Sequence, residues 1–243
     1  AHARAAGMRA VLSTNGTLID EATAARLAAI GLSYVGISLD GLGEVNDRFR
    51  GRAGAFDAAL RGIRNCRAAG PKVGLRLTMN RRNAAEIPAI FDLIERERIP
   101  RVCFYHLVPA GRGSALAPDV LTHEQTRAAL DAILERASAL HAAGNPVEVL
   151  TVDNHADGPY VYQRLLRENP PRAASVLELL RMNGGNSTGV GIGCVSWNGD
   201  VLPDQFWRPH VLGTVLERPF SRIWNDLRQP LRAALLDREA LLG

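Results

Sequence analysis

Residues 8–41 read MRAVLSTNGTLIDEATAARLAAIGLSYVGISLDG, and this stretch contains two short apolar runs that each end in small polar residues and a glycine. The first run leads into Ser13-Thr14-Asn15-Gly16, and the second leads into Ser38-Leu39-Asp40-Gly41. With a helix between the runs, the stretch predicts a strand–helix–strand unit. Because ligands bind at the carboxyl ends of parallel strands, we expect a small-molecule site at these two tips.

The same alternation continues along the chain. It predicts strands at 8–14, 34–39, 73–79, 101–107 and 146–151, and helices at 20–30, 54–69, 84–98 and 122–143. Strands that alternate with helices of this length form right-handed crossover units, so their sheet is parallel. The sequence therefore predicts an α/β fold for this part of the chain.

Residues typical of helix ends support these boundaries. Asp20 is the expected N-cap of the first helix, and Gly31 follows its last residue. Two capping boxes are expected, one in which Asn83 is paired with Glu86 and one at 122–125. These signals fix where three of the four helices begin.

The C-terminal part of the chain follows a different pattern. The sequence predicts two helices and then a small β module, with helices at 160–168 and 172–182, strands at 192–197, 200–206 and 211–215, and a last helix from Pro219. Asn198-Gly199 is typical of a two-residue hairpin turn, so the strands on either side of it are expected to pair.

The composition limits the classes of partner. The chain has 243 residues, 47% of them hydrophobic, and a net charge of +4 from 29 basic and 25 acidic residues. Basic and acidic residues are interleaved, which argues against nucleic-acid binding. No apolar stretch approaches the ~20 residues of a membrane span, and no signal peptide is visible. The odd number of cysteines, Cys66, Cys103 and Cys194, then indicates a reducing, cytoplasmic setting.

The strand-end motifs resemble those of a known enzyme family. Thr14-Asn15-Gly16, Ser38-Leu39-Asp40-Gly41 and Thr78-Met79-Asn80 look like the middle of a radical SAM barrel, and the loop at 106–113 is similar to the next strand end. The hairpin at 194–203 resembles the start of the SPASM/twitch extension. The resemblance implies an α/β fold, with a partial parallel (β/α) radical SAM barrel at 1–155. A helical connector and the start of a β-hairpin SPASM/twitch-like module would follow at 156–243.

The segment Asp204-Gln205-Phe206-Trp207, together with 212–215 and 220–224, resembles the haem-biosynthesis branch of this family, and most of all its haem d1 members. The branch implies an enzyme that cleaves S-adenosylmethionine (SAM) at a [4Fe-4S] cluster and uses the resulting radical to abstract a substrate hydrogen. The implied reaction is removal of propionate side chains from didecarboxysirohaem. Three alternatives stay open: a sister enzyme that makes iron-coproporphyrin by acetate removal, a SPASM peptide maturase, and a non-catalytic α/β binding protein.

The resemblance also assigns a cofactor site. Asn15, Ser38, Asp40 and Asn80 would line the SAM groove, since hydroxyl, amide and carboxylate groups suit the ribose hydroxyls and the methionine ends. The same residues are common in turns for conformational reasons alone, which is the alternative explanation for each.

Four further residues are candidates for contact with the substrate or a metal. Arg76 could reach a substrate carboxylate or form a salt bridge inside the barrel, and His106 lies at a strand end that faces the barrel mouth. His155 could act as an acid or iron ligand, or be an ordinary loop histidine. Cys194 is a candidate ligand of an auxiliary iron–sulfur cluster or a packed small residue. No residue is assigned a catalytic role.

Aromatic residues near the hairpin have two interpretations. Trp197, Phe206 and Trp207 could stack on a flat macrocycle, or they could form the small core that docks the module. The expected partners are a tetrapyrrole substrate and an electron donor such as flavodoxin or ferredoxin.

The chain also departs from the family pattern. The C-x3-C-x2-C loop that holds the catalytic cluster is absent, and Asp204 stands where the SPASM pattern has a cysteine. We interpret the chain, which runs from Ala1 to Gly243, as a fragment that lacks both ends of the enzyme. Alone it is expected to be inactive and poorly stable, because an opened barrel exposes strand edges and apolar faces.

Overall fold

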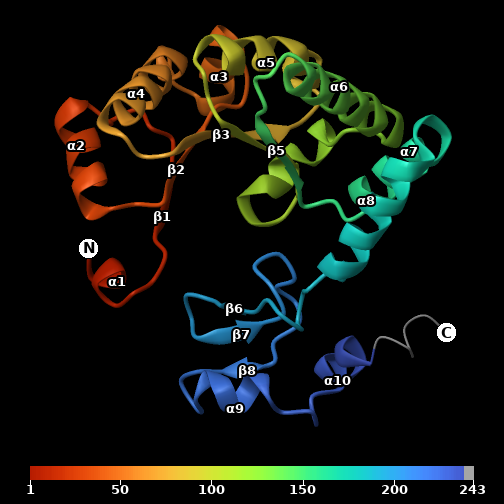
Figure 1. Ribbon diagram of the computed structural model, residues 1–243. Helices are drawn as coiled ribbons and strands as arrows, with labels where there is room; N and C mark the ends of the chain where they lie inside the picture. Colours follow the sequence, from red (N-terminus) through yellow and green to blue (C-terminus); the bar gives the residue numbers. More distant parts are fainter. Residues whose placement is uncertain (238–243) are drawn as a thin grey trace. The chain divides into compact units, whose positions relative to one another are not determined.

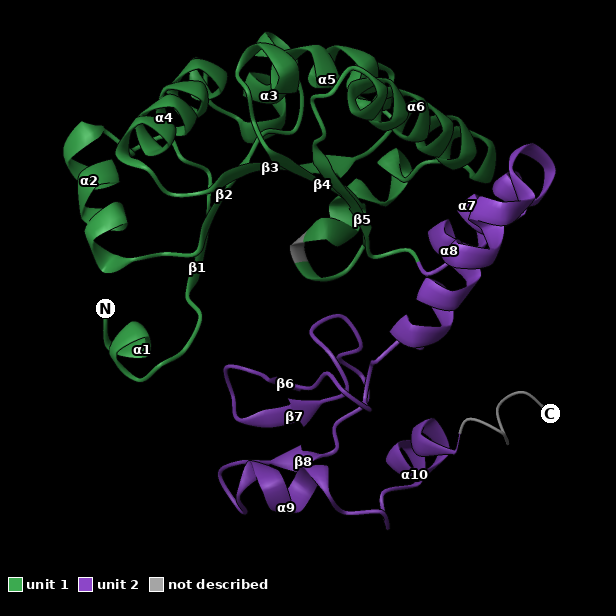
Figure 2. Ribbon diagram, viewed as in Figure 1, with its two compact units in different colours: residues 1–154 green, residues 155–243 purple. Residues whose placement is uncertain are grey.

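The computed structural model describes residues 1–237, apart from the side chain of Arg112. The chain divides into two compact units, Ala1–Asn154 and His155–Gly243 (Figure 2).

The first unit is built on a parallel five-stranded sheet with the order β1-β2-β3-β4-β5. Its strands are β1 (Val11–Thr14), β2 (Tyr34–Ser38), β3 (Val73–Met79), β4 (Arg101–His106) and β5 (Glu148–Val152). Its helices are α1 (His2–Ala5), α2 (Glu21–Ile30), α3 (Gly43–Arg50), α4 (Ala55–Ala69), η1 (Ala84–Glu86), α5 (Ile87–Arg96), η2 (Gly111–Asp119) and α6 (His123–Ala142). Figure 1 shows α2 to α6 along one face of the sheet. The predicted parallel α/β architecture is confirmed.

The core of this unit lies between that sheet face and the helices. Every second strand residue contributes to it, among them Val35, Ile37, Leu75, Leu77 and Phe104. Phe104 stacks on Phe91 of α5, with ring centroids 5.6 Å apart. Since side chains alternate along a strand, the residues between these lie on the opposite face of the sheet.

Two of the predicted helix starts are confirmed. The Asp20 carboxylate accepts a hydrogen bond from the Thr23 amide at 2.8 Å, and Gly31 ends α2 in the left-handed conformation. Thr122 and Gln125 form the complete capping box of α6.

The capping box predicted at Asn83 and Glu86 is wrong. The Asn83 amide donates to the carbonyl oxygens of Asp40 and Thr78, and its oxygen accepts from the Asn80 amide. The Glu86 carboxylate accepts from the Leu42 amide at 2.9 Å. Both side chains therefore join neighbouring strand ends instead of capping the helix, and a 3₁₀ turn precedes α5.

The second unit contains two helices followed by a small antiparallel sheet with the order β6-β7-β8. Its elements are α7 (Asp157–Glu168), α8 (Pro170–Asn183), β6 (Cys194–Val195), β7 (Asp200–Leu202), β8 (Gly213–Thr214), α9 (Phe220–Trp224) and α10 (Pro230–Leu236). Val201, Leu212 and Ile223 form its small core. No helix among the described residues is long and apolar enough to cross a lipid bilayer.

The β6–β7 hairpin is confirmed as a hairpin, but its two-residue turn is wrong. The Ser196 amide bonds to the Asp200 carbonyl at 2.8 Å, and the Gly199 amide bonds back to the Ser196 carbonyl at 3.0 Å. The loop therefore has three residues, and Gly199 supplies the positive φ of 89° that such a loop needs at its last position.

Candidate functional site

A pocket of about 220 Å³ lies at the carboxyl ends of β1 and β2, in the first unit. Asn15 and Thr17 border it from the tip of β1, and Ser38 borders it from the end of β2. The remaining lining residues come from α3, α4 and the segment between them: Asn46, Arg50, Arg52, Ala55 and Ala59. The pocket thus lies at the two strand tips that the sequence singled out, and Asn15 and Ser38, two of the predicted site residues, border it.

Behind this pocket lies a network centred on Asp40, whose residue is only 3% exposed. The Asp40 carboxylate forms an ion pair with Arg50 and accepts a hydrogen bond from the Thr78 amide at 3.0 Å. The Asn46 side chain accepts from the Asp40 amide at 2.9 Å. Burial raises the pKa of the Asp40 carboxyl, while the Arg50 guanidinium acts in the opposite direction. Asp40 therefore holds Arg50 and the strand ends in place.

Asn80 is also buried, and its hydrogen bonds are local. Its amide group donates to the Thr78 carbonyl at 3.0 Å, and its oxygen accepts from the Arg82 amide at 2.9 Å. Of the four residues expected to line a SAM groove, Asn15 and Ser38 thus border the pocket. Asp40 and Asn80 shape the backbone behind it.

The structure places the three substrate candidates in different settings. Arg76 is half-buried on the sheet face opposite the helices, with its guanidinium 4.6 Å from the ring centroid of Tyr105. His106 is half-buried, and alternation along β4 assigns it to the face of Phe104, opposite to Tyr105. His155 is exposed just before α7, at the start of the second unit.

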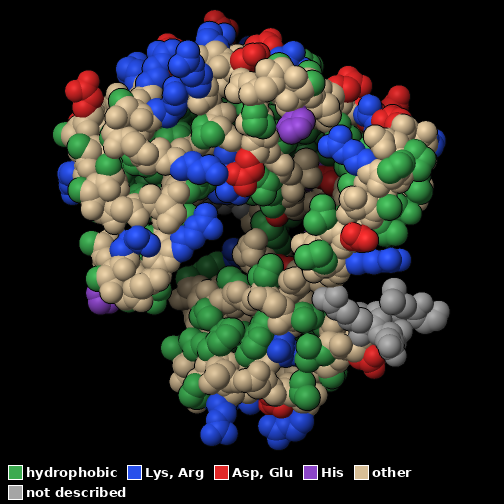
Figure 3. Space-filling view, viewed as in Figure 1, with side chains coloured by type: hydrophobic (Ala, Val, Ile, Leu, Met, Phe, Trp, Pro, Cys, Tyr) green, Lys and Arg blue, Asp and Glu red, His purple; other side chains and the backbone are tan. Residues whose placement is uncertain are grey.

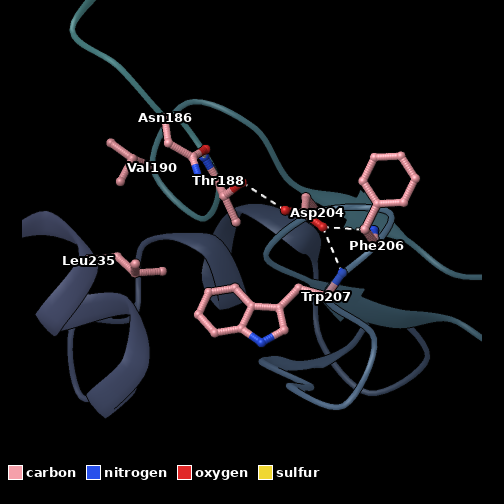
Figure 4. A pocket seen from close by; sticks show the side chains of 7 residues that line it. All are labelled: Asn186, Thr188, Val190, Asp204, Phe206, Trp207 and Leu235. Atoms are coloured by element: carbon pink, nitrogen blue, oxygen red, sulfur yellow. Dashed lines mark hydrogen bonds between the residues drawn. The ribbon is translucent and has the colours of Figure 1, made fainter. Parts of the chain in front are cut away.

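A second pocket, of about 520 Å³, lies within the second unit. It is lined by Asn186, Thr188, Val190, Asp204, Phe206, Trp207 and Leu235 (Figure 4). Trp197 lies outside this lining and is 85% exposed, with the Arg208 guanidinium 5.0 Å from its ring centroid. Two of the three aromatic residues considered for macrocycle stacking therefore border one pocket.

Asp204 forms the turn at the edge of this second pocket. Its carboxylate accepts hydrogen bonds from the Thr188 hydroxyl and from the Phe206 and Trp207 amides, each at 2.7 Å. Although burial alone would raise the pKa of the Asp204 carboxyl, these hydrogen bonds bring it below its usual value. The carboxylate thus closes the turn at 204–207 and joins it to the distant segment at Thr188, so its role in this structure is to hold these two segments together.

The described residues do not form a site for an iron–sulfur cluster. Cys194 is a half-buried free thiol on β6, opposite Leu202. Within the described part of the chain, no three histidine, cysteine or acidic side chains are grouped so that they could hold a metal ion. The prediction of Cys194 as a cluster ligand stays a prediction.

Comparison with known proteins finds a family model and two relatives that are similar to this chain. A family model described as "Radical SAM superfamily" matches residues 1–94. Fe-coproporphyrin III synthase from Methanosarcina barkeri is 62% identical over 242 residues, which are 100% of this chain and 61% of that protein. The chain is thus similar to the radical SAM superfamily over residues 1–94 and to a haem-biosynthesis enzyme over its whole length. Pre-heme d1 synthase from Dinoroseobacter shibae is 40% identical over 226 residues, which are 92% of this chain and 56% of that protein.

Solved structures with a similar fold are also found. SuiB from Streptococcus suis bound to S-adenosylmethionine has a TM-score of 0.71 at 14% identity, over 97% of this chain and 52% of that one. Native anSMEcpe with bound AdoMet has a TM-score of 0.63 at 18% identity, over 90% and 56%. At such identities the likeness shows the fold alone, and it confirms the predicted α/β radical SAM fold.

These findings decide several predictions. The predicted resemblance to radical SAM proteins, a family that uses SAM and a [4Fe-4S] cluster, is confirmed over residues 1–94, and two of the similar proteins are named as haem-biosynthesis enzymes. The choice of the haem d1 enzymes within that branch is not confirmed, because the Fe-coproporphyrin III synthase is more similar than the pre-heme d1 synthase. The chain spans about three-fifths of the length of these relatives.

The sequence reading missed the contributions of α3 to the pocket. Asn46, Arg50 and Arg52 lie within or just after this short helix. The sequence feature that could have predicted these residues is the Asp40-Gly41 strand tip. A buried carboxylate at a strand end needs a cationic partner, and Arg50 follows within one short helix.

Proposed function

We propose that this protein is a radical SAM enzyme that modifies a sirohaem-derived tetrapyrrole, and that it removes acetate side chains to form iron-coproporphyrin. The observation that carries this proposal is the 62% identity to the Fe-coproporphyrin III synthase, which extends over 100% of the chain. The alternative first favoured by the sequence, removal of propionate side chains, has the support of a relative at 40% identity. The acetate reaction is therefore preferred.

We assign SAM to the pocket at the ends of β1 and β2. The donors available there fit this cofactor, because Arg50 and Arg52 suit the carboxylate of its methionine part. The Ser38 and Thr17 hydroxyls and the Asn15 amide suit its ribose hydroxyls and amino group. Asp40 and Asn80 would act behind this layer, Asp40 by orienting Arg50 and Asn80 by fixing the backbone after β3.

SAM bound in this pocket would supply a deoxyadenosyl radical that takes hydrogen from the substrate. The part of the protein described here would bind and orient the cofactor through the α3 arginines and the two strand tips. Alanines at positions 55 and 59 of α4 also border the pocket, and they would leave room for the cofactor near the helix.

We further propose that the first unit is the partial barrel and that the second unit begins a SPASM/twitch-like module. The described residues group no three possible metal ligands, so this proposal assigns none of them to the catalytic cluster and keeps Cys194 as a candidate ligand of an auxiliary cluster. The reductant would be a flavodoxin or a ferredoxin, because a low-potential electron donor is needed to cleave SAM reductively.

The test uses the complete gene product, purified without oxygen and reconstituted with iron and sulfide. It is incubated with SAM, a reductant and didecarboxysirohaem, and the product is identified by mass spectrometry. Loss of acetate groups supports the proposal. Loss of propionate groups, which are one methylene larger, would instead support the haem d1 reaction. An intact tetrapyrrole in a preparation that cleaves SAM would refute both.

A further inference from the structure

The sheet face opposite the helices carries two stacked pairs of arginine and tyrosine. On β4, the Arg101 guanidinium lies 5.0 Å from the ring centroid of Tyr34 on β2. On β3, the Arg76 guanidinium lies 4.6 Å from the ring centroid of Tyr105 on β4. Such cation–π contacts hold a guanidinium in place without using its hydrogen-bond donors.

The two arginines differ in their anionic partners. Arg101 has a carboxylate beside it, since its Nη1 lies 3.4 Å from Glu148 Oε1 on β5. Arg76 makes no ion pair with any residue in the part of the chain that the structure describes. Arg76 is nevertheless only half exposed, so part of its side chain has left water. A guanidinium that is held in place and lacks a carboxylate partner is suited to bind an anion from outside the chain.

The backbone makes room for this arrangement. A Cβ atom added at Gly36 would lie 2.7 Å from Arg76 Cδ and 3.0 Å from Tyr34 Cε1. The glycine on β2 therefore lets the arginine side chain lie flat across the neighbouring strand. Any larger residue at position 36 would push the guanidinium away from its present place.

The position of Arg76 connects it with the proposed SAM pocket. Ser38, which lines that pocket, is the register partner of Arg76 in the β2–β3 ladder. Adjacent strands are about 4.8 Å apart, so Arg76 lies one strand beyond the pocket, on the same face as Ser38. An anion on Arg76 would consequently lie next to the cofactor, where a reacting substrate has to be.

We propose that Arg76, held by Tyr105 and by the space at Gly36, binds a carboxylate side chain of the tetrapyrrole substrate. The inference rests on the proposed function, because only that function supplies a substrate with several carboxylates. The planar guanidinium can form two parallel hydrogen bonds with one carboxylate, which would fix the orientation of the macrocycle. Arg76 is thus a binding residue that selects which side chain lies near the cofactor.

The first experiment compares Arg76→Gln with Arg61→Gln in the reconstituted complete gene product. Arg61 is exposed on α4, so its substitution removes the same charge at a distance from this face. We expect Arg76→Gln to weaken binding of didecarboxysirohaem about tenfold or more, as for loss of a charge-assisted hydrogen bond, while substrate-free SAM cleavage stays within about twofold. Gly36→Ala should weaken tetrapyrrole binding in the same direction, and Arg61→Gln should leave it unchanged.

The second experiment asks whether the ligand of Arg76 is a carboxylate. Tetrapyrrole binding is measured with the free acid and with its methyl ester, in wild type and in Arg76→Gln. If the proposal is right, the two losses are not additive, and esterification costs the variant less affinity than it costs the wild type.

Three results would overturn the inference. If Arg76→Gln binds the tetrapyrrole with wild-type affinity, or if the losses on esterification are additive, Arg76 does not bind the substrate. These two results would leave the proposed function itself standing. An equal loss of SAM binding in Arg76→Gln would assign this arginine to the cofactor. A wild-type protein that binds no tetrapyrrole would refute the proposed function, and this inference with it.

Discussion

Glu97 is a buried carboxylate at the end of α5 that joins this helix to α4. Its two oxygens accept hydrogen bonds from Arg64 Nε and Nη2, at 2.9 and 2.7 Å. The hydrogen bond from Arg64 lowers the pKa of the Glu97 carboxyl, and burial acts against it. The residue is 8% exposed, whereas the Arg64 side chain is 56% exposed, so solvent screens much of the attraction.

The lowered pKa of Glu97 gives a pH-dependent prediction. A carboxyl whose pKa is lower in the folded state stabilises the fold above its unfolded pKa, and this stability is lost as the pH falls through the folded value. We expect Glu97→Gln to reduce the free energy of unfolding by about 1 kcal/mol at pH 7 and to have no effect once Glu97 is protonated in both states. Urea unfolding of the complete gene product from pH 7 to pH 3 checks this, and a constant difference across that range would contradict it.

Asp204 gives a second prediction, within the second unit. Its carboxylate accepts two hydrogen bonds from its own turn and one from Thr188, so Asp204→Ala leaves two amides and one hydroxyl without their partner. We expect a loss of about 1–2 kcal/mol in the free energy of unfolding of this unit. Asp204→Asn keeps an acceptor for the amides and should lose less. The change can be followed through tryptophan fluorescence, and equal losses in both variants would argue against the loop role.

At the scale of elements, the packing of α4 against the tip of β1 depends on one glycine. A Cβ atom added at Gly62 would lie 2.3 Å from the carbonyl oxygen of Gly16, which directly follows Asn15 of the proposed SAM pocket. Figure 3 shows basic side chains gathered over the outer surface of the first unit near α4, so this helix has one polar face and one closely packed face.

Gly62→Ala is therefore expected to destabilise the fold although alanine is the better helix former. Overpacking costs about 1–3 kcal/mol, and it would move the β1 tip and weaken SAM binding. Ala68→Gly, at an exposed position of the same helix, serves as the control. It measures the difference in helix propensity between alanine and glycine, which is about 1 kcal/mol. Equilibrium unfolding and SAM binding of the complete gene product, measured together, check the prediction, and a stabilised Gly62→Ala variant would disprove the close contact.

The sequence was sufficient to predict the elements whose signals are local. Apolar runs and cap residues such as Asp20 and Thr122 act over only a few residues. The alternation of strands and helices could therefore be predicted from them. The predictions were wrong where a side chain bonds to a strand end that is distant in the sequence. Asn83 and Glu86 fit a capping box, but they bond to residues near position 40 because the sheet brings those strand ends together.

The candidate site was predictable to the same extent. Asn15 and Ser38 directly follow apolar strand runs, and the structure places both at one pocket. Arg50 was missed because α3 is short and charged, so it lacks the apolar period that marks a helix. Arg101 has a carboxylate partner and Arg76 has none among the described residues, because different strands lie beside them. The spacing of residues along the chain does not reveal these neighbours.

At the scale of the whole molecule, the first unit leaves both edges of its sheet without a partner strand among the described residues. β1 pairs only with β2, and β5 pairs only with β4. β1 is flanked by exposed apolar side chains, with Met8 at 60%, Val11 at 57% and Leu18 at 80% exposure. Unpaired edges with apolar residues favour pairing with another chain.

We therefore expect a polypeptide of residues 1–243 alone to self-associate and to lack a single cooperative unfolding transition. Val11→Lys should reduce the association, because a lysine on an edge strand would have to lose its hydration when a second strand pairs there. Val195→Lys, on the short β6 strand of the second unit, is the control, since Val195 is exposed to a similar degree, 48%. Light scattering over a range of concentrations measures the association. A monomeric wild-type chain that melts cooperatively would show that the edge of β1 is not the source of instability, and equal association in both variants would assign the contact to another surface.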